Sequence, residues 1–353
     1  MIMTKFAING FGRIGRIAMR VWLSRPDLQA ETDLVAINTS GSMPASGWAH
    51  VLKYDTSYGV LSQAISVEEV KSPKEATDED PLIGYLTVLD RKIPILAQRD
   101  PAKLPWGKYE VDVVIESTGA FEDEAGAGKH LAAGAKKVLI SAPSKGGAIH
   151  THVLGVNRYN GTDPIADNAS CTTNCIAPVA AVIHQAFGIK KAALTTVHAY
   201  TDDQNLQDGS HPKDMRRARA AGRNIVPTST GAAKAVTQVI PELKGLFDGI
   251  ALRVPVATGS LSDLTFVVGK PTTVEQVNQT IKDAAGKPEW QGIIAWTEEP
   301  IVSSDIVGRS ESTIVDLSLT QVIDGDLVKI LTWYDNEWGY SNRLVEQVIE
   351  VGK

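Results

Sequence analysis

Residues 4–15 read TKFAINGFGRIG, and this stretch decides the architecture of the first half of the chain. Thr4–Ile8 predicts a short buried strand, and the following GFGRIG fits the pattern G-x-G-x-x-G at the point where helical periodicity begins. Glycines at these places permit a tight turn, a close approach of phosphate to the backbone and close packing of helix on strand. The N-terminus of a helix adds free N–H groups and partial positive charge. The stretch therefore predicts a βαβ unit that binds a dinucleotide.

Strands and helices alternate through the rest of the first half. Asp123–Ala133 reads as a helix, and Pro26 is expected to end the helix that follows the glycines. Further buried strands are predicted at Leu34–Ile37, Val111–Ile115 and Val138–Ile140. This alternation is typical of an α/β domain with a doubly wound (Rossmann) parallel sheet. The charged stretch Ser66–Asp80 predicts a solvated loop or the rim of a hairpin, and we assign no function to it.

The pattern changes near residue 170. A helix is predicted after Ser170 and ends at Gly188, and Trp338–Val351 again has helical periodicity. The strands between them are longer and fewer helices separate them: Ala192–Val197, Ile250–Val256, Leu264–Val268, Thr313–Val322 and Leu327–Tyr334. This favours an α+β domain on a large mixed or antiparallel sheet. We expect a dinucleotide-binding domain at 1–170, completed by the C-terminal helix 338–353, and a catalytic domain at 171–337.

Length and composition agree with a globular protein of two domains. The chain has 353 residues, of which 43% are hydrophobic and 22% charged, and its formal net charge is −6. Dispersed Lys and Arg argue against nucleic acid as a partner, and no apolar run is long enough to span a membrane. Two cysteines cannot form a disulfide framework and the first residues show no leader, so we expect a cytoplasmic protein.

The end of the second predicted strand bears on the choice of cofactor. In this fold an Asp or Glu there normally binds the ribose hydroxyls of NAD. This chain instead has Asn38-Thr39-Ser40. Without a carboxylate the 2′-phosphate of NADP is not repelled, and Thr39 and Ser40 supply hydroxyl donors. We therefore expect NADP to be preferred, with NAD as a second cofactor.

The helix predicted after Ser170 begins with Cys171. A cysteine at a helix N-terminus lies at the positive end of the dipole, which lowers the pKa of its thiol. His198, at the end of a predicted strand, is the candidate base that such a nucleophile needs. The other six histidines lack such a setting. Cys175 is expected to pack as a small apolar residue, and we expect no metal site.

Five segments, INGFGRIGR, ASCTTNC, TVHAYT, PTSTGAAKA and WYDNEWGYSNR, together resemble the phosphorylating glyceraldehyde-3-phosphate dehydrogenase family. The similarity runs from Lys5 to Arg343 and the terminal helix. It implies that Cys171 attacks the aldehyde carbon to form a thiohemiacetal and that His198 accepts the proton. Oxidation then leaves a thioester, which inorganic phosphate converts to 1,3-bisphosphoglycerate. The resemblance also implies a homotetramer.

The resemblance further implies which residues bind the phosphates and the cofactor. Substrate phosphate is expected at Thr201 and Arg253, with Arg217 between the two phosphate sites. The attacking phosphate is expected at Ser170, Thr172, Thr230 and Gly231. The expected cofactor-binding residues are Gly10, Gly12, Arg13, Ile14, Gly15, Thr39, Ser40, Arg99, Thr118, Ser141, Ser210 and Asn336.

Two positions distinguish this chain from the NAD-specific members that it resembles. Those members carry Asp at the position of Thr39 and tend to carry Leu-Pro in place of Gly209-Ser210, whereas members that accept NADP resemble this chain at both. Asp202–Arg223 would be the loop that reaches the cofactor of a neighbouring subunit. Two alternatives stay open: a dehydrogenase of erythrose 4-phosphate, and a non-catalytic homologue that acts by binding.

Overall fold

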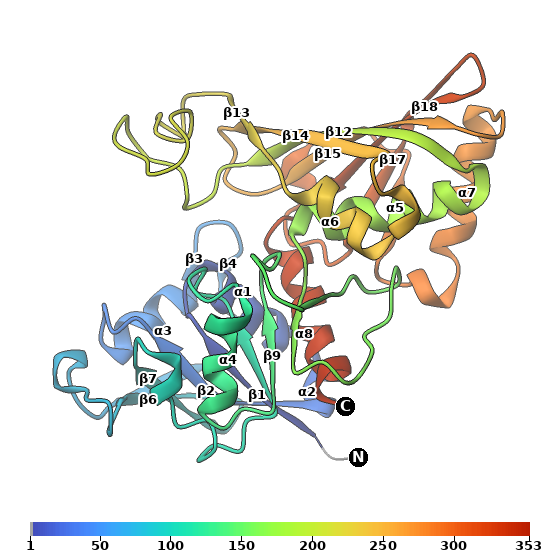
Figure 1. Cartoon of the computed structure of the whole chain (residues 1–353). Coiled ribbons are helices and arrows are strands. Elements are labelled where there is room, and N and C mark those ends of the chain that lie inside the picture. Colours follow the sequence, from blue (N-terminus) through green and yellow to red (C-terminus); the bar gives the residue numbers. More distant parts are fainter. Residues whose placement is uncertain (1–2) are drawn as a thin grey trace. The chain divides into compact units, whose positions relative to one another are not determined.

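The computed structural model describes residues 3–353, which form two compact units (Figure 1). The first contains the residues up to His152 together with Tyr159–Asn168 and Ser341–Lys353. The second contains Val153–Arg158 and Ala169–Tyr340. The chain therefore passes into the second unit directly before the candidate nucleophile.

A nine-stranded sheet forms the first unit, with strand order β10-β11-β9-β8-β1-β2-β7-β6-β5. Neighbours from β10 to β7 are parallel, as the α/β prediction requires, and β6 and β5 add an antiparallel edge. The strands are β1 (Thr4–Asn9), β2 (Thr32–Thr39), β5 (Ile65–Glu69), β6 (Leu82–Val88), β7 (Arg91–Ala97), β8 (Val113–Glu116), β9 (Lys137–Ile140), β10 (His150–Thr151) and β11 (Ile165–Asp167). A separate pair is formed by β3 (Tyr54–Asp55) and β4 (Gly59–Val60).

The helices of the first half are α1 (Arg13–Ser24), α2 (Pro26–Glu31), α3 (Ala45–Lys53) and α4 (Glu124–Ala132), and α8 (Trp338–Gly352) closes the chain. Helix α1 buries Ile17, Ala18 and Val21, and its Trp22 packs edge-on against Phe6 of β1 with ring centroids 6.0 Å apart. Pro26 does more than was expected of it. It follows the end of α1 and also occupies the first turn of α2, where its missing N–H costs nothing.

The charged stretch Ser66–Asp80 contributes most of the edge strand β5 and the loop that follows it, which confirms the prediction of a hairpin rim. Within the loop, Ser72 and Glu75 form a reciprocal capping box, and Lys71 pairs with Asp80. These local contacts hold the loop on the surface without a buried core of its own.

The second unit has a mixed seven-stranded sheet with order β13-β14-β12-β15-β18-β17-β16. The pairs β12–β14 and β16–β17 are parallel and the others antiparallel, in agreement with the predicted α+β domain. The strands are β12 (Ile189–Ala199), β13 (Val226–Ser229), β14 (Phe247–Val254), β15 (Ser260–Val268), β16 (Ile294–Thr297), β17 (Thr313–Ile323) and β18 (Leu327–Tyr334). The short strands β13 and β16 were not predicted from the sequence, and neither were β6 and β7 of the first unit.

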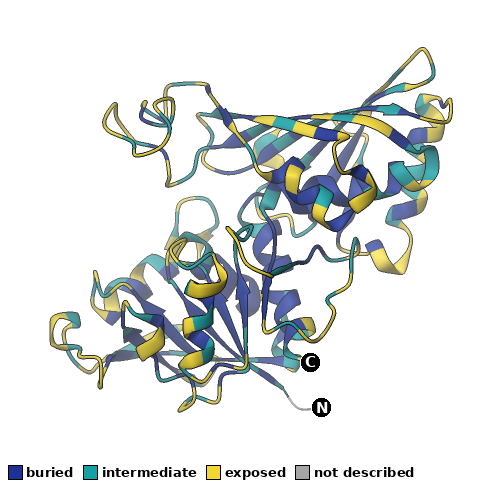
Figure 2. Cartoon of the chain, in the orientation of Figure 1, coloured by how far each residue is buried: buried dark blue, intermediate teal, exposed yellow. Residues whose placement is uncertain are grey.

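Helices α5 (Cys171–Phe187), α6 (Ala232–Val239) and α7 (Val274–Ala285) pack on this sheet, and α5 contacts both of the others (Figure 1). Helix α5 is buried along most of its length, and β15 alternates buried and half-buried residues (Figure 2). One face of the sheet and the three helices therefore share a single hydrophobic core. Short 3-10 helices lie at Pro73–Glu75, Pro101–Lys103, Pro241–Leu243, Pro288–Trp290 and Ser303–Ile306.

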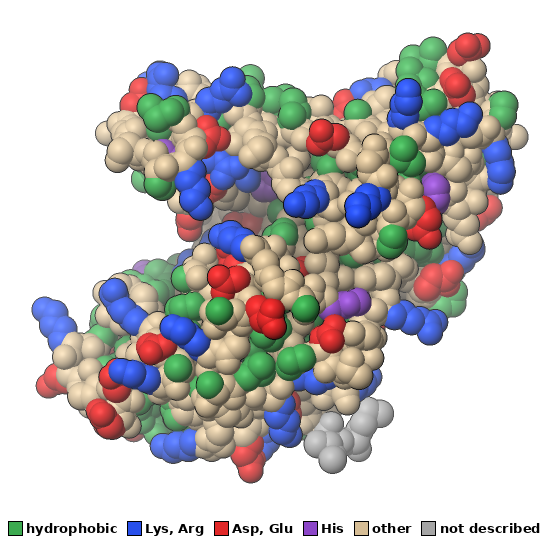
Figure 3. Space-filling model, in the orientation of Figure 1, with side chains coloured by type: hydrophobic (Ala, Val, Ile, Leu, Met, Phe, Trp, Pro, Cys, Tyr) green, Lys and Arg blue, Asp and Glu red, His purple; other side chains and the backbone are tan. Residues whose placement is uncertain are grey.

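Surface charge and helix length bear on the classes of partner. On the face drawn in Figure 3, Lys and Arg side chains are interspersed with Asp and Glu. That face therefore presents no field of a single sign to attract a polyanion. Within residues 3–353, every helix is too short or too polar to cross a membrane.

Replacing Gly188 by Ala tests the backbone that ends α5. Gly188 has a φ of 70°, which costs an L-residue about 1–2 kcal/mol, and no atom lies within 4 Å of an added Cβ. The cost is therefore one of backbone conformation alone, and we expect the Tm of thermal unfolding to fall by roughly 2–5 °C.

Gly128→Ala is the matched control, because Gly128 lies inside α4 with equally open surroundings. Alanine favours a helix interior by about 1 kcal/mol, so this Tm should stay or rise. An unchanged Tm for Gly188→Ala would contradict the left-handed ending.

Candidate active site

Helix α5 begins at Cys171, as predicted, and Ser170 caps its N-terminus. The hydroxyl oxygen of Ser170 accepts the backbone N–H of Thr173 at 3.0 Å. Ala169 has a φ of 51°, which is uncommon for a residue with a Cβ, and the hydroxyl of Tyr340 donates to its carbonyl oxygen at 3.2 Å. This tight entry places the thiol at the positive end of the helix dipole.

Cys171 and His198 lie together. The distance between Sγ of Cys171 and Nε2 of His198, near the end of β12, is 3.3 Å. The cysteine is partly exposed, whereas the histidine is 4% exposed. A thiol and an imidazole at this distance can share one proton, which is the arrangement of an activated nucleophile and its base.

The second ring nitrogen of His198 sets the direction of that hydrogen bond. Nδ1 lies 2.6 Å from the carbonyl oxygen of Ala199, which can only accept, so we assign the proton to Nδ1 and the lone pair to Nε2. Nη1 of Arg253 lies 2.8 Å from the same Nδ1 and donates to Ala199 O and to the hydroxyl of Thr201, both at 3.1 Å. The N–H at Nδ1 of His198 and the N–H of Arg253 are both donors, so they repel each other at this contact. The guanidinium would therefore gain from an anion.

Burial dominates the titration of this pair. It raises the pKa of the Cys171 thiol, although the positive charge of Arg253 acts in the opposite direction. Burial, together with the charge of Arg253, lowers the pKa of His198 to about 3. The backbone N–H groups at the start of α5 act to lower the pKa of the thiol, as expected, but desolvation outweighs them. A thiolate at this site would form by transfer of the proton to the imidazole, and the two groups would then titrate as a unit.

Asp203, which sequence analysis did not single out, joins the residues expected at the substrate phosphate. The hydroxyl of Thr201 and Nη1 of Arg217 both donate to its carboxylate. Arg253 donates to Thr201, and its own Nε is buried with no hydrogen-bond partner among the described residues. Two guanidinium groups and a hydroxyl thus converge where an oxyanion is expected, and a carboxylate occupies part of that place. An acid two residues after Thr201, among expected phosphate ligands, was the signal that could have found it.

The residues expected at the attacking phosphate lie at two helix N-termini. Ser170 and Thr172 belong to the start of α5. Gly231 is the N-cap of α6, and the hydroxyl of Thr230 accepts the N–H of Ala232 at 3.2 Å. Each set therefore combines hydroxyl groups with the positive end of a helix, which suits an anion.

Tyr334 is a further residue of the site, which lies within the segment WYDNEWGYSNR but was not singled out there. Its hydroxyl lies 2.9 Å from those of both Thr172 and Thr196, and its ring meets that of His198 edge-on at 6.0 Å. Burial raises the pKa of its phenol, so the group stays neutral. Tyr334 therefore limits the orientations open to the imidazole and links it to the first turn of α5.

In the first unit the glycine turn has the predicted form. Gly10 has a φ of 96°, and an added Cβ at Gly15 would lie 2.1 Å from the carbonyl oxygen of Gly10. At Gly12, the N-cap of α1, no atom lies within 4 Å of an added Cβ and no side chain caps the helix. Open space beside an uncapped helix N-terminus fits a pyrophosphate group. Ile14 lies in this first turn, whereas the guanidinium of Arg13 pairs with Asp55.

The end of β2 differs from expectation in one respect. The hydroxyl of Thr39 is buried, donates to the carbonyl oxygen of Leu96 at 2.9 Å and accepts the N–H of Gly41 at 3.2 Å. Its proton is therefore engaged within the protein, which corrects the expectation that Thr39 serves as a donor to phosphate. Ser40 is exposed, and its hydroxyl contacts that of Ser42 at 3.0 Å.

The other residues expected to bind the cofactor lie in both units. Arg99 and Thr118 are exposed just after β7 and β8, and Ser141 follows β9. Ser210 lies on the exposed segment between β12 and β13. The structure thus places the first three after neighbouring or nearby strands of one sheet.

Asn336 follows β18 in the second unit and is 5% exposed. Its Oδ1 accepts from the N–H of Gly259 at 3.0 Å and from the hydroxyl of Ser260 at 2.9 Å. Because the amide oxygen is engaged in this way, the NH₂ group is the end that can bind a carbonyl, such as that of a nicotinamide amide.

Cys175 is fully buried one turn below Cys171, as predicted, and burial raises the pKa of its thiol to about 12. It is therefore no competitor of Cys171 for electrophiles. Across residues 3–353, no group of three or more His, Cys, Asp or Glu is placed to hold a metal ion.

Comparison with known proteins gives full-length matches. Residues 4–124 match the model of the glyceraldehyde 3-phosphate dehydrogenase NAD binding domain, and residues 170–336 match that of the C-terminal domain. The chain is 50% identical to the glyceraldehyde-3-phosphate dehydrogenase of Streptomyces coelicolor over 352 residues, which cover 99% of this chain and 98% of the relative. It is also 50% identical to chloroplastic glyceraldehyde-3-phosphate dehydrogenase A of Zea mays over 344 residues, 97% of this chain and 81% of the relative.

Alkylation of Cys171 by iodoacetamide tests the shared proton. Burial raises the pKa of the isolated thiol, so without an acceptor the reaction should be confined to alkaline pH. We expect His198→Gln to slow alkylation at pH 7 at least about tenfold and to shift the rate profile toward higher pH.

Cys171→Ser should abolish rapid labelling and thereby identify the reacting thiol. If His198→Gln kept the wild-type rate and profile, the helix N-terminus alone would activate the cysteine, and the pair would have no role in it.

Proposed function

Because the chain belongs to the glyceraldehyde-3-phosphate dehydrogenase family of nicotinamide-dependent oxidoreductases, we propose that it is itself a phosphorylating glyceraldehyde-3-phosphate dehydrogenase. The observation that carries this proposal is the 3.3 Å contact between Cys171 and His198 at the start of α5. The guanidinium of Arg253, with a buried and unpartnered Nε beside this pair, supports a phosphorylated substrate.

In the proposed reaction Cys171 is the nucleophile and His198 carries the protons. Sγ bonds to the aldehyde carbon as Nε2 accepts the thiol proton and passes it to the former carbonyl oxygen, which gives a thiohemiacetal. Nε2 then accepts the hydroxyl proton while the C–H bond breaks. A bound nicotinamide would supply the acceptor for the hydride. The product of this half-reaction is a thioester on Cys171.

The second half-reaction transfers the acyl group to inorganic phosphate. Phosphate bonds to the thioester carbon, and Sγ leaves as a thiolate that recovers its proton from His198. The hydroxyl groups at the starts of α5 and α6 would orient the phosphate. A thioester suits this step because the energy of the aldehyde oxidation is kept in a reactive acyl group.

Asp203 would compete with a substrate phosphate for the same cationic side chain, Arg217. Its carboxylate accepts hydrogen bonds from the hydroxyl of Thr201 and from the guanidinium of Arg217. A substrate phosphate would take over these donors, because a dianion is the stronger acceptor.

The cofactor proposed is NADP, with NAD as a second choice. No carboxylate stands at the end of β2, so a 2′-phosphate meets no repulsion there, and exposed Ser40 offers a hydroxyl. Thr39 contributes through its lack of charge, since its proton is engaged by Leu96. The proposal includes a cytoplasmic homotetramer in which Ser210 reaches a neighbouring cofactor.

Activity with and without phosphate tests the covalent reaction. We expect the purified chain to oxidise glyceraldehyde 3-phosphate only when inorganic phosphate or arsenate is present, and Cys171→Ala to lose activity by at least about 10⁴-fold, because no other group can carry the acyl intermediate. Cys175→Ala serves as the control and should retain most activity. Full activity of Cys171→Ala would refute the mechanism. A preference for erythrose 4-phosphate would move the assignment to that substrate.

Kinetics with both dinucleotides test the cofactor. We expect a higher kcat/KM with NADP⁺ than with NAD⁺, and expect Thr39→Asp to reverse or sharply reduce the preference. Setting a carboxylate beside the 2′-phosphate should cost about 1.5–3 kcal/mol, or ten- to a hundredfold.

Thr39→Val is the matched control, because it removes the hydrogen bond to Leu96 without adding charge. It should lower the Tm and leave the preference within about threefold. Equal efficiencies that Thr39→Asp leaves untouched would mean that this position does not decide the cofactor.

A further inference from the structure

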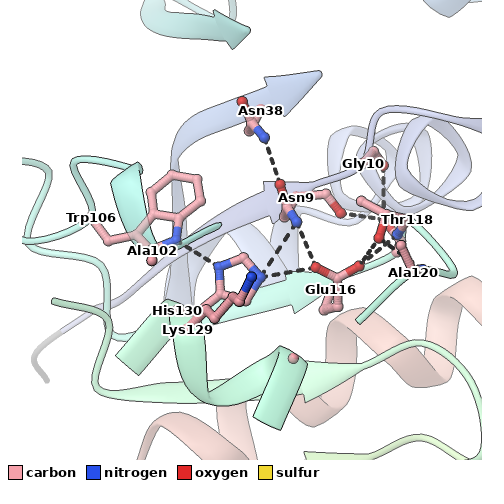
Figure 4. A network of polar contacts seen from close by, with 12 residues as sticks. Asn9, Gly10, Asn38, Ala102, Trp106, Glu116, Thr118, Ala120, Lys129 and His130 are labelled. Carbon is pink, nitrogen blue, oxygen red and sulfur yellow. Dashed lines mark hydrogen bonds and ion pairs between the residues drawn. The ribbon is translucent and has the colours of Figure 1, made fainter. Parts of the chain in front are cut away.

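A chain of buried polar side chains crosses the carboxyl ends of the strands in the first unit (Figure 4). Asn9 ends β1 and stands in register with Glu116, which ends β8, and with Asn38 in β2. Nδ2 of Asn9 donates to Oε2 of Glu116 at 2.5 Å, and Nδ2 of Asn38 donates to Oδ1 of Asn9 at 2.6 Å. None of the three is more than 3% exposed.

Two aromatic residues extend this chain beyond β8. The indole Nε1 of Trp106 donates to Nδ1 of His130 in α4 at 2.9 Å, so this nitrogen is the acceptor. The proton of the neutral ring is then on Nε2, which donates to Oε2 of Glu116 at 2.9 Å. Both Trp106 and His130 are fully buried. We call Trp106, His130, Glu116, Asn9 and Asn38 the polar belt.

The hydrogen bonds from Asn38 through Asn9, and from Trp106 through His130, both lead to Glu116. Nδ2 of Asn38 also donates to the carbonyl oxygen of Gln98 at 2.8 Å, and Nδ2 of Asn9 lies 3.4 Å from Nε2 of His130. The carboxylate of Glu116 receives the donors of Asn9 and His130 at Oε2, and the N–H and hydroxyl of Thr118 at Oε1. An ionised carboxylate is the one side-chain group of this size that accepts at both oxygens and donates at neither. Its presence therefore fixes the direction of each amide and the tautomer of the imidazole, and such a network is rigid when every member is satisfied.

The belt lies directly behind the residues expected to bind the dinucleotide. Asn9 precedes Gly10, Asn38 precedes Thr39, and Glu116 holds Thr118. At the far end, Oδ1 of Asn38 accepts the N–H of Gln98, the residue before Arg99, at 3.0 Å. Gly10 is held as well, since its N–H donates to the carbonyl oxygen of Asn38 at 3.0 Å.

We propose that the polar belt positions the dinucleotide site and that Glu116 is its central positioning residue. The belt itself is too deeply buried to touch a cofactor, and acts by holding the four loops that follow β1, β2, β7 and β8 in one fixed arrangement. This inference rests on the proposed function only in that the ligand is a nicotinamide dinucleotide.

Glu116→Gln tests the proposal with little change of shape. Glutamine offers one acceptor oxygen and directs an NH₂ group at donors, so either Thr118 or the pair Asn9 and His130 loses its acceptor. We expect isothermal titration calorimetry to show Kd for NADP⁺ and for NAD⁺ raised about tenfold or more. In steady-state kinetics KM for the dinucleotide should rise with kcat nearly unchanged, and alkylation of Cys171 should keep its wild-type rate.

Thr32→Val is the matched control at the opposite end of β2. Thr32 is fully buried, accepts from Nε1 of Trp22 at 3.1 Å and donates to the carbonyl oxygen of Leu28 at 2.6 Å. Its loss should lower the Tm as much as Glu116→Gln does and leave both Kd values within twofold. Should Glu116→Gln fail to fold, Trp106→Phe removes the most distant donor of the belt and should still weaken binding about threefold.

Three outcomes separate the alternatives. Weaker binding by the belt variants, with the control unaffected, supports the belt as a positioning device. If the belt variants lower the Tm but leave Kd within twofold, the belt only stabilises the fold and the inference is overturned. A wild-type chain that binds neither dinucleotide would overturn the proposed function along with it.

Discussion

The chemistry proposed for the second unit depends on a partly exposed thiol held in contact with a buried imidazole. Burial alone moves the pKa of Cys171 upward and that of His198 downward, so neither group gains by ionising by itself. Proton transfer within the pair creates two charges 3.3 Å apart, which stabilise each other beside the dipole of α5. The strands decide which charges surround this pair, because His198 in β12 stands in register with Arg253 in β14. An anion bound at Arg253 would lessen the repulsion that opposes an imidazolium.

Features set by neighbours in sequence could be predicted, and features set by sheet register could not. The glycine turn, the start of α5 at Cys171 and its end at Gly188 follow from a few adjacent residues, and each lies where it was expected. Strand length did not decide which strands were found, since β8 and β9, of four residues each, were predicted, whereas β6 and β7, of seven residues each, were not. The donor role expected of Thr39 failed because its partner, Leu96, lies on a strand 57 residues away.

The polar residues overlooked in the sequence share a cause. His130 was set aside with the other histidines because nothing near it in sequence resembles a site, yet Trp106 and Glu116 meet it from other elements. Tyr334 and Asp203 likewise acquire their roles from partners on different segments. The role of a buried polar side chain can be inferred only when its hydrogen-bond partners are known, whereas the burial of an apolar side chain can be predicted from the periodicity of the sequence.

The two units differ in how their buried polar groups are paired, and this difference agrees with the roles proposed for them. Around Glu116, four donors bind the carboxylate, and this complete set of hydrogen bonds holds the loops that depend on it. Around Cys171 and Arg253 the polar groups are not fully paired. Burial raises the pKa of the Cys171 thiol, and Nε of Arg253 has no hydrogen-bond partner in the described chain. The hydroxyl of Thr201 and the guanidinium of Arg217 donate to Asp203. A phosphorylated substrate would supply the missing negative charge. We therefore expect a rigid site at Glu116, where the protein supplies every hydrogen-bond donor, and a reactive site at Cys171, where the substrate has to supply the anion.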